Sequence, residues 1–283
     1  MPTKKTVASH RFYYQEGIRR APPLLRLPKA DTKIWRFMPV SKFLDVIARK
    51  SIFLTQLSKF QSSDPHEGSL AFGRLSYLQR IMNDDSFARQ ELHIDEGQPI
   101  PTEIRAAYDP RLTAWQNQIS AERIYVNCWH ISAVESAHLW STYAAFGEGV
   151  AIQTSVGALS RSLINKAHIT IAPVRYIDYQ NFEIGPSLED ASFYKRLSFK
   201  AERELRIRYL LPFEQCAKVI DGKTFWKPPV GIYLPIDCAT LIENVYISPT
   251  LSAWFGDTIT RLLAQLGIEK NVVRSSILDP RIL

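Results

Sequence analysis

Two glutamates separated by one residue give the clearest chemical signal in this sequence of 283 residues. Glu202 and Glu204 lie in a stretch that also contains Arg206 and Arg208, and an extended backbone would place all four side chains on one face. Neighbouring carboxyl groups raise each other's proton affinity, whereas nearby arginines lower it. The pair could hydrogen-bond a substrate and act as a base, or it could belong to a solvated strand face with exposed ion pairs.

Two aromatic residues follow at helical spacing. Trp140 and Tyr143 are three residues apart and would share one face of a helix. Such a pair could stack on a flat ring of a ligand, and Tyr176 offers a third aromatic ring. Packing in the core is the default interpretation for an aromatic pair of this kind.

Two smaller groups could bind a metal ion. Asp64, His66 and Glu67 lie within four residues, although Asp-Pro and Glu-Gly are also ordinary turn chemistry, which we favour. Cys128 and His130 are two apart in a predicted strand, where a buried cysteine beside a hydrogen-bonded histidine is the favoured interpretation. We therefore expect no metal site. Gly-rich phosphate loops, HExxH and GxSxG motifs are absent from the sequence.

The composition predicts a folded protein, with 46% apolar and 22% charged residues. No apolar run approaches the roughly 18–20 residues that span a bilayer, and the first residues have no apolar signal segment. The three cysteines lack CxxC spacing, which is typical of reduced thiols in a cytoplasmic protein.

The net charge of +7 is concentrated at the N-terminus, because residues 1–36 contain nine basic and two acidic residues. A basic arm with Phe12, Tyr13 and Tyr14 could bind nucleic acid through phosphate contacts and stacking. A solvated extension that docks its aromatics on its own domain is the favoured alternative. We expect residues 1–32 to form this arm with a Pro-rich linker, and residues 33–283 to form a single domain.

The element pattern mixes strands and helices without a regular βαβ alternation, which favours an α+β fold with a mixed or antiparallel central sheet. A helical insertion is expected at about residues 70–120, and residues 199–211 are ambiguous between helix and strand. The predicted strands are 34–37, 52–55, 124–129, 149–154, 170–176, 241–247 and 272–273, and the predicted helices are 41–50, 70–83, 102–120, 133–144, 156–165 and 251–266.

Taken together, several stretches resemble the bacterial family known as domain of unknown function 2971. The resemblance extends from about residue 33 to the C-terminus, and the basic arm lies outside it. It brings no settled activity. The stretches that carry it are 34–38, 62–68, 126–130, 139–143, 149–152, 200–206 and 241–249.

A second resemblance is to ADP-ribosyltransferases of the Arg–Ser–Glu type. That family has an Arg on an early strand, a Ser-Thr-Ser element on a central strand and Glu-x-Glu near a later strand. Here Arg36, Thr154 with Ser155, and Glu202 with Glu204 stand in that order. Gln occupies the first position of the Ser-Thr-Ser element, and the long gap after Arg36 requires the helical insertion.

This second resemblance implies an ADP-ribosyltransferase-like fold with NAD as the substrate. Glu204 would stabilise the oxocarbenium-like ribose and Glu202 would orient the attacking group. Arg36 would bind the diphosphate through its forked donors. Thr154 or Ser155 would fix the strand that carries the nicotinamide pocket, and Trp140, Tyr143 or Tyr176 would stack on the nicotinamide ring.

The function that we expect is ADP-ribosyl transfer from NAD, or NAD hydrolysis, in a bacterial toxin or anti-phage defence effector. The acceptor would be a protein or a nucleic acid, and Arg36 and Glu204 should then lie on neighbouring strands of one cleft. The alternative is a non-catalytic nucleic-acid-binding protein that uses the basic arm. A third hypothesis is a metal-dependent nuclease built on Asp64, Glu67, Asp178, Lys200 and Glu202.

Overall fold

A computed structural model describes residues 19–20, 26–69, 72–143, 148–183 and 191–279, and the structural statements below concern these residues. Most of the predicted basic arm lies outside them. The described residues Arg19–Arg20 form β1, which pairs in parallel with β8 (Phe182–Glu183).

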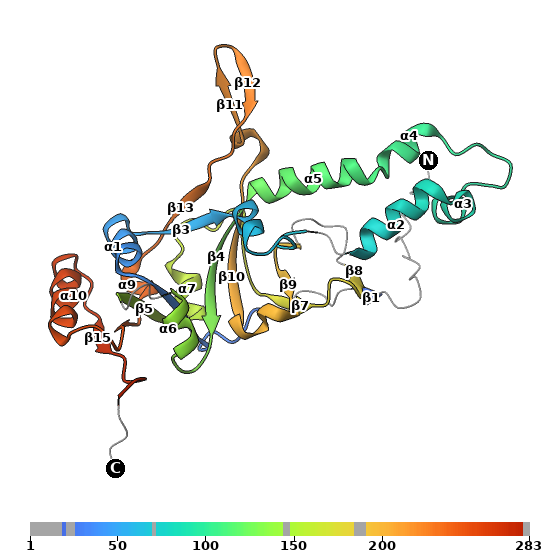
Figure 1. The fold of residues 1–283 in the computed structure, drawn as a ribbon. Helices are drawn as coiled ribbons and strands as arrows, with labels where there is room; N and C mark the ends of the chain where they lie inside the picture. The colour runs from blue at the N-terminus through green and yellow to red at the C-terminus, as the bar shows by residue number, and fades with distance from the viewer. Residues whose placement is uncertain (1–18, 21–25, 70–71, 144–147, 184–190, 280–283) are drawn as a thin grey trace, which may run out of the picture.

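A nine-stranded, mostly antiparallel sheet forms the body of the described structure (Figure 1). The predicted α+β class with a mixed or antiparallel central sheet is therefore confirmed. β10 and β6 continue the sheet from β4, and β6 is an edge strand, as Pro173 predicts. The strands are, in spatial order, β13 (Gly231–Pro235), β3 (Ser51–Gln56), β4 (Ile124–Ile131), β2 (Lys33–Pro39), β5 (Gly149–Ser155), β14 (Asn244–Ile247) and β15 (Asn271–Arg274), with β10 (Glu204–Leu210) and β6 (Ile169–Pro173) beside β4.

Strand β4 is the junction of the sheet. One edge pairs with β10 from Glu204, opposite His130, to Leu210. The other edge is shared, because β3 pairs with the beginning of β4 and β2 pairs only with its end, where Trp35 lies opposite His130. Strands β2 and β3 therefore part beside the middle of β4, and helix α1 (Val40–Arg49) connects them along the chain.

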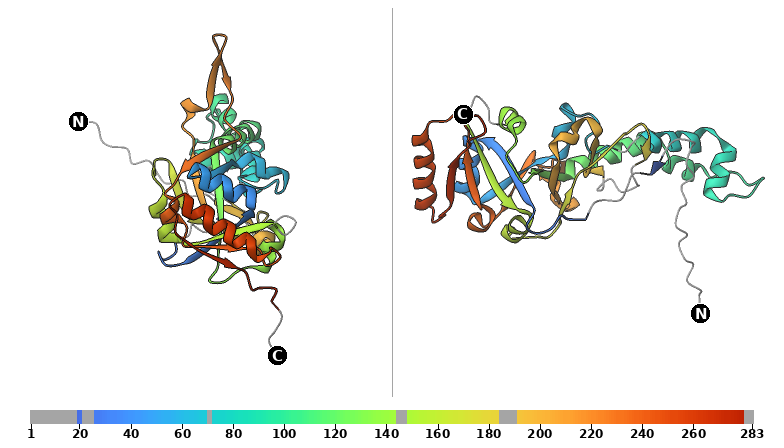
Figure 2. Two further views of the ribbon diagram at one scale, coloured as in Figure 1. Left: turned by 90° about the vertical axis from the view of Figure 1, so that its left-hand side faces the viewer. Right: turned by 90° about the horizontal axis from the view of Figure 1, so that it is seen from below.

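The expected helical insertion is present, and Figures 1 and 2 show it extending away from the sheet. Two details differ from the sequence prediction. The acidic stretch after Asn83 contains a helix, because the Asp84 side chain accepts a hydrogen bond from Phe87 N and caps it. The predicted helix 102–120 is divided at Asp109, which caps a new helix that begins at Pro110. The helices are α2 (Phe72–Asn83), α3 (Asp85–Leu92), α4 (Thr102–Ala107) and α5 (Pro110–Arg123).

Among the remaining elements, a hairpin of residues 217–226 projects away from the body and α10 lies at the end opposite the insertion (Figure 1). The predicted strand 241–247 begins only at Asn244, because Asp237 caps a short helix before it. The predicted helix 133–144 begins at Ala137. The elements are α6 (Ala137–Tyr143), α7 (Val156–Ser162), α9 (Cys238–Leu241), α10 (Ala253–Gln265), β7 (Arg175–Ile177), β9 (Tyr194–Arg196), the hairpin of β11 (Ala217–Ile220) and β12 (Lys223–Trp226), and the short 3₁₀ helices η1 (Leu57–Ser62), η3 (Leu197–Glu202) and η4 (Phe213–Gln215).

One face of the sheet carries the largest apolar cluster, which includes Ile34, Trp129, Leu205 and Ile207. Removing such side chains from water is the main contribution to folding. On the opposite face, Trp35 packs with α6 in a smaller cluster. None of the described helices is long and apolar enough to cross a membrane.

Candidate functional site

The two glutamates meet at a sharp change in the backbone. Glu202 is the last residue of η3, Arg203 adopts a left-handed conformation with φ of 42° and ψ of 52°, and Glu204 begins β10. The backbone carbonyl of Arg203 accepts a hydrogen bond from Ile131 N at 2.9 Å, which holds the bend against β4. Of the two possibilities for this ambiguous stretch, the extended backbone begins only at Glu204, and the carboxyl groups of Glu202 and Glu204 converge through the bend at Arg203.

Lys195 joins the two carboxyl groups. Its ammonium nitrogen lies 2.5 Å from Glu202 Oε2 and 2.9 Å from Glu204 Oε1. The Glu204 side chain is 7% exposed, whereas the Glu202 side chain is 22% exposed. Of the two carboxyl groups, Glu202 is the more accessible to a molecule arriving from solvent.

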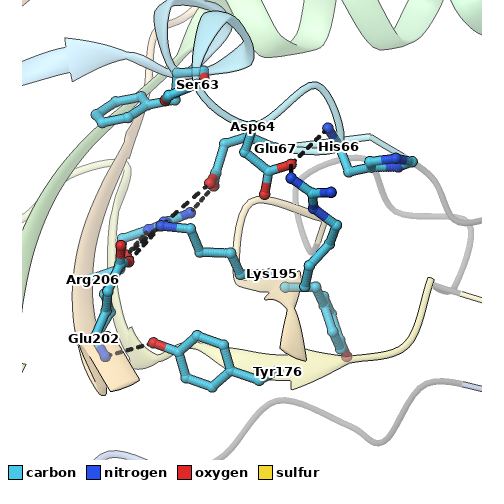
Figure 3. Close-up of polar contacts among 12 residues, drawn as sticks. Ser63, Asp64, His66, Glu67, Tyr176, Lys195, Glu202 and Arg206 are labelled. Carbon is cyan, nitrogen blue, oxygen red and sulfur yellow. Dashed lines mark hydrogen bonds and ion pairs between the residues drawn. The ribbon is translucent and has the colours of Figure 1, made fainter. Parts of the chain in front are cut away.

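Arg206 holds the buried glutamate from the other side. Its Nη2 donates to Glu204 Oε2 at 2.7 Å and its Nη1 donates to Glu67 Oε1 at 2.7 Å. Figure 3 shows this cluster, with the Asp64–Glu67 turn on one side and Tyr176 on the other. The Tyr176 hydroxyl accepts a hydrogen bond from Glu204 N at 2.9 Å and so fixes the start of β10.

The environments of Glu202 and Glu204 move their pKa values in opposite directions. Burial raises the pKa of Glu202 to about 7, and a hydrogen bond with Glu204 adds to this shift, while Lys195 opposes it. Burial also acts to raise the pKa of Glu204, but Arg206, Glu202 and Lys195 outweigh it, and the pKa falls far below its usual value. Near neutral pH, Glu204 is therefore ionised while Glu202 exchanges a proton.

The aromatic residues divide between the site and the core. Tyr143 is 45% exposed, and burial together with Glu202 and Glu204 raises its pKa to about 12, so the phenol stays protonated at neutral pH. Trp140 is 5% exposed, donates from Nε1 to Glu135 Oε2 and packs edge-on against Phe37. The charges of the carboxyl pair thus reach Tyr143, whereas Trp140 is a core residue.

Arg36 lies where β2 leaves β4. Because Trp35 pairs with His130, which in turn pairs with Glu204, the alternation of β2 directs Arg36 to the other face of the sheet. Its guanidinium carbon is 6.0 Å from the ring centroid of Trp129. Burial lowers the pKa of Arg36 to about 10, and the neighbouring Cys128 opposes this shift.

The expectation that Arg36 and Glu204 lie on neighbouring strands is wrong, because β4 lies between β2 and β10. Cys128 nevertheless lies close enough to both Arg36 and Glu204 to interact electrostatically with each of them. It pairs with Arg206 across the sheet, and burial, followed by the charge of Glu204, raises its pKa to about 12. Among the described residues, Arg36 Nη1 has no hydrogen-bond partner.

Thr154 and Ser155 have different surroundings from Glu204. Thr154 pairs with Ile34 and is fully buried, and its hydroxyl has no partner in the described part of the chain. Ser155 caps helix α7 through Ala158 N and donates to Glu243 Oε1 at 2.5 Å. The structure therefore does not place either hydroxyl in the carboxyl cluster.

The two candidate metal groups are explained by other contacts. Asp64 pairs with Arg196 at 2.9 Å and caps its own turn by accepting a hydrogen bond from His66 N, which confirms the turn interpretation. His130 Nδ1 lies 2.7 Å from the backbone carbonyl of Glu202, as expected for a hydrogen-bonded histidine. Within the described ranges, no cluster of three or more His, Cys, Asp or Glu side chains could hold a metal ion.

The residue that sequence reasoning missed is Lys195. It follows residues 184–190, which lie outside the described part of the chain, and a single lysine in a Tyr-Lys-Arg triplet has no distinguishing pattern. Only the pairing of β9 with β7 and the path of η3 place its ammonium group between the two glutamates. Its position depends on tertiary structure and has no local signal.

Neither a family model nor a curated protein matches this chain. Its function must therefore be inferred from the residues of the site.

Proposed function

We propose that this chain is a cytoplasmic bacterial enzyme with an ADP-ribosyltransferase-like fold, which cleaves the bond between nicotinamide and ribose in NAD. The ADP-ribose then passes to water or to a protein or nucleic-acid acceptor. The observation that carries the proposal is the carboxyl pair itself. One carboxylate is buried and ion-paired with Lys195 and Arg206, which hold its pKa far below the usual value, and its neighbour is partly accessible, contacts the same Lys195 and has a pKa of about 7.

The chemistry requires two carboxylates in these two states. When the bond from C1′ of the ribose to the pyridinium nitrogen breaks, its electron pair goes to that nitrogen and neutral nicotinamide leaves. The ribose becomes an oxocarbenium-like cation, which a fixed negative charge stabilises. Glu204 supplies that charge, and Lys195 and Arg206 keep it ionised in a buried position.

The attacking group then needs a base. An O–H of water or of the acceptor forms the new bond to C1′, and its proton passes to the Glu202 carboxylate. A pKa near 7 suits a general base that must accept and release a proton at neutral pH. Tyr143 is exposed beside this pair, where it can stack on the nicotinamide ring.

Arg36 is the candidate for binding the diphosphate of NAD, and because β2 directs it to the face of the sheet opposite Glu204, the diphosphate would have to reach it where β2 and β3 part beside β4. A buried guanidinium that lacks a carboxylate partner has an unfulfilled need for an anion, and Arg36 Nη1 is unpartnered among the described residues. Near this side chain and Cys128, strands β2 and β3 diverge, and the middle of β4 has no described strand paired to it on this edge. Forked donors suit a diphosphate better than the single ammonium of lysine.

Nicotinamide release and NAD affinity, measured separately on the wild-type chain and on Arg36→Lys, test the proposal. We expect nicotinamide release by the wild type and a loss of NAD affinity in Arg36→Lys that exceeds the loss in rate at saturating NAD. Arg161→Lys, on helix α7, is the matched control and should leave both quantities unchanged. A wild-type chain that neither binds NAD nor releases nicotinamide with any candidate acceptor would refute the enzymatic function.

A further inference from the structure

The Asp64–Glu67 turn reaches the carboxyl pair from a distant part of the chain. Glu67 Oε1 accepts a hydrogen bond from Arg206 Nη1 at 2.7 Å, across 139 residues of sequence. Glu67 Oε2 lies 3.8 Å from the ammonium nitrogen of Lys195. One carboxylate therefore contacts both cations that hold Glu204.

The turn is fixed in this position. The Glu67 side chain is 1% exposed, and Gly68 has a φ of 69°. A Cβ on Gly68 would lie 2.5 Å from Cδ2 of the fully buried Leu57, so both the conformation and the space require glycine. Glu67 cannot swing into solvent without moving this turn.

The charges of the cluster do not balance if every group is ionised. Glu67, Glu202 and Glu204 would contribute three negative charges, and Lys195 and Arg206 contribute two positive ones. Among the three carboxylates, the Glu202 side chain has the greatest exposure, 22%, and within the described residues its only cationic partner at ion-pair distance is Lys195. The surplus proton of the cluster therefore belongs on Glu202.

We propose that Glu67 is a positioning residue for the reaction: through Arg206 and Lys195 it orients Glu204 and keeps a proton on Glu202. The role in the reaction rests on the proposed function, whereas the effect on the proton of Glu202 does not. Removing the negative charge of Glu67 leaves two carboxylates for two cations, so the ionised form of Glu202 becomes more favourable. The other ionisable or charged groups around Glu202 are Glu204 on β10, Tyr143 on α6, Tyr176 on β7, Lys195 on β9, His130 on β4 and the adjacent Arg203.

Two isosteric variants separate this role from simple structural support. Glu67→Gln removes the charge that faces Arg206, and Asp64→Asn removes a charge from the same turn that faces Arg196 instead. The titration of Glu202 is followed by carboxyl-carbon NMR on the whole chain, with Glu202→Gln used to identify its signal. This measurement needs no activity.

We expect the titration midpoint of Glu202 to fall by about one pH unit in Glu67→Gln, and to stay within about 0.3 units in Asp64→Asn. If the proposed function holds, the rise of nicotinamide release with pH, which follows the ionisation of Glu202, shifts to lower pH by the same amount. An unchanged midpoint in Glu67→Gln, or equal shifts in the two variants, overturns the inference.

Absence of activity in every variant, together with the expected NMR shift, would refute the proposed function and retain the role of Glu67 in holding the proton. If Glu67→Gln does not fold, Glu67→Asp supplies the test, because it keeps the charge and shortens the side chain by one methylene. We expect its Glu202 midpoint to stay near that of the wild type while the release rate falls. A midpoint in Glu67→Asp that drops by a full unit overturns the inference.

Discussion

The two faces of strand β10 are both buried, but by opposite means. Leu205 and Ile207 are fully buried within the large apolar cluster. On the other face, Glu204 is 6% exposed and Arg206 is 1% exposed, and they are satisfied by ion pairs and hydrogen bonds. The first five residues of this strand, Glu204–Arg208, thus present an apolar face and a charged face, and both are buried.

The difference shows which face is expected to carry function. Burying an aliphatic side chain contributes about 1.5–3 kcal/mol to stability, so the apolar face needs no further explanation. Burying an ion pair carries a desolvation cost that the attraction between the partners often only offsets. Stability alone therefore does not account for the cluster of Glu67, Arg206, Glu204 and Lys195. A fixed charge in a buried site is, however, well suited to stabilise charge that develops in a transition state.

The largest expected effect on stability comes from removing the arginine of the charged face. Arg206→Met should lower the free energy of unfolding by about 3–5 kcal/mol, because Glu67 and Glu204 would remain buried without their guanidinium partner. Ile207→Val on the opposite face should cost about 0.5–1.5 kcal/mol. Urea unfolding measures both. A loss in Arg206→Met no greater than in Ile207→Val would contradict a dry, coupled cluster.

The second effect concerns rate rather than stability. Glu204→Gln keeps the shape and removes the negative charge, so nicotinamide release should slow about a hundred- to a thousandfold, on the order of 3–4 kcal/mol. NAD affinity should fall much less, since the charge acts mainly as the ribose becomes cationic. The exposed Glu214→Gln is the matched control and should alter stability by no more than about 0.5 kcal/mol. Full activity in Glu204→Gln would reject this residue as the stabilising group.

Local patterns predicted much of the sheet and the apolar face. Helix α1 and strand β4 follow from periodicity, and the edge position of β6 follows from Pro173. The break at Asp109 and the start of the short helix after Asp237 depend on side-chain caps that compete with the longer pattern.

The site was predicted only in part. Glu202 and Glu204 were recognised as a pair, but their convergence depends on a left-handed residue that sequence patterns do not reveal. Arg206 was expected on the face of Glu204, whereas the contact of Glu67 with Arg206 joins segments 139 residues apart. Such contacts are set by strand order, which a single sequence does not encode locally.

The third prediction tests the bend that brings the carboxyl groups together. A non-glycine residue in the left-handed region costs roughly 1–2 kcal/mol, and a β-branched residue fits it worst. Arg203 already carries this cost, so Arg203→Val should lower stability only by the extra crowding of a β-branched side chain, on the order of 1 kcal/mol, and reduce nicotinamide release, whereas Arg203→Gly should stay within about 1 kcal/mol of the wild type. Thermal unfolding and the release assay measure the two effects.

Lys50 provides the control for this bend, because it also adopts a left-handed conformation, with a φ of 47°, at the end of helix α1. Among the described residues, no hydrogen bond or ion pair joins Lys50 to the carboxyl cluster. Lys50→Val should destabilise the fold by a similar amount and leave release of nicotinamide unchanged at temperatures where the protein is folded. Equal effects of the two valine variants on release would show that the bend at Arg203 has no special part in positioning Glu202.

The last prediction, which separates the two glutamates, concerns the dependence on pH. The folded-state pKa of Glu202 is about 7, above its ordinary value of 4.5, so folding favours the protonated form. The stability that this proton contributes is complete below about pH 4.5 and is lost as the pH rises to about 7.

Release of nicotinamide should change in the opposite sense and rise through pH 7, because the ionised carboxylate is the base. Glu202→Gln should flatten both curves between pH 5 and 8, whereas Glu204, with its pKa far below the usual value, stays ionised across that range and contributes no slope to either. Unfolding free energies and release rates measured at half-unit steps test this, and a wild-type stability that increases from pH 5 to 7 by an amount that Glu202→Gln abolishes would reverse the assignment of the raised pKa.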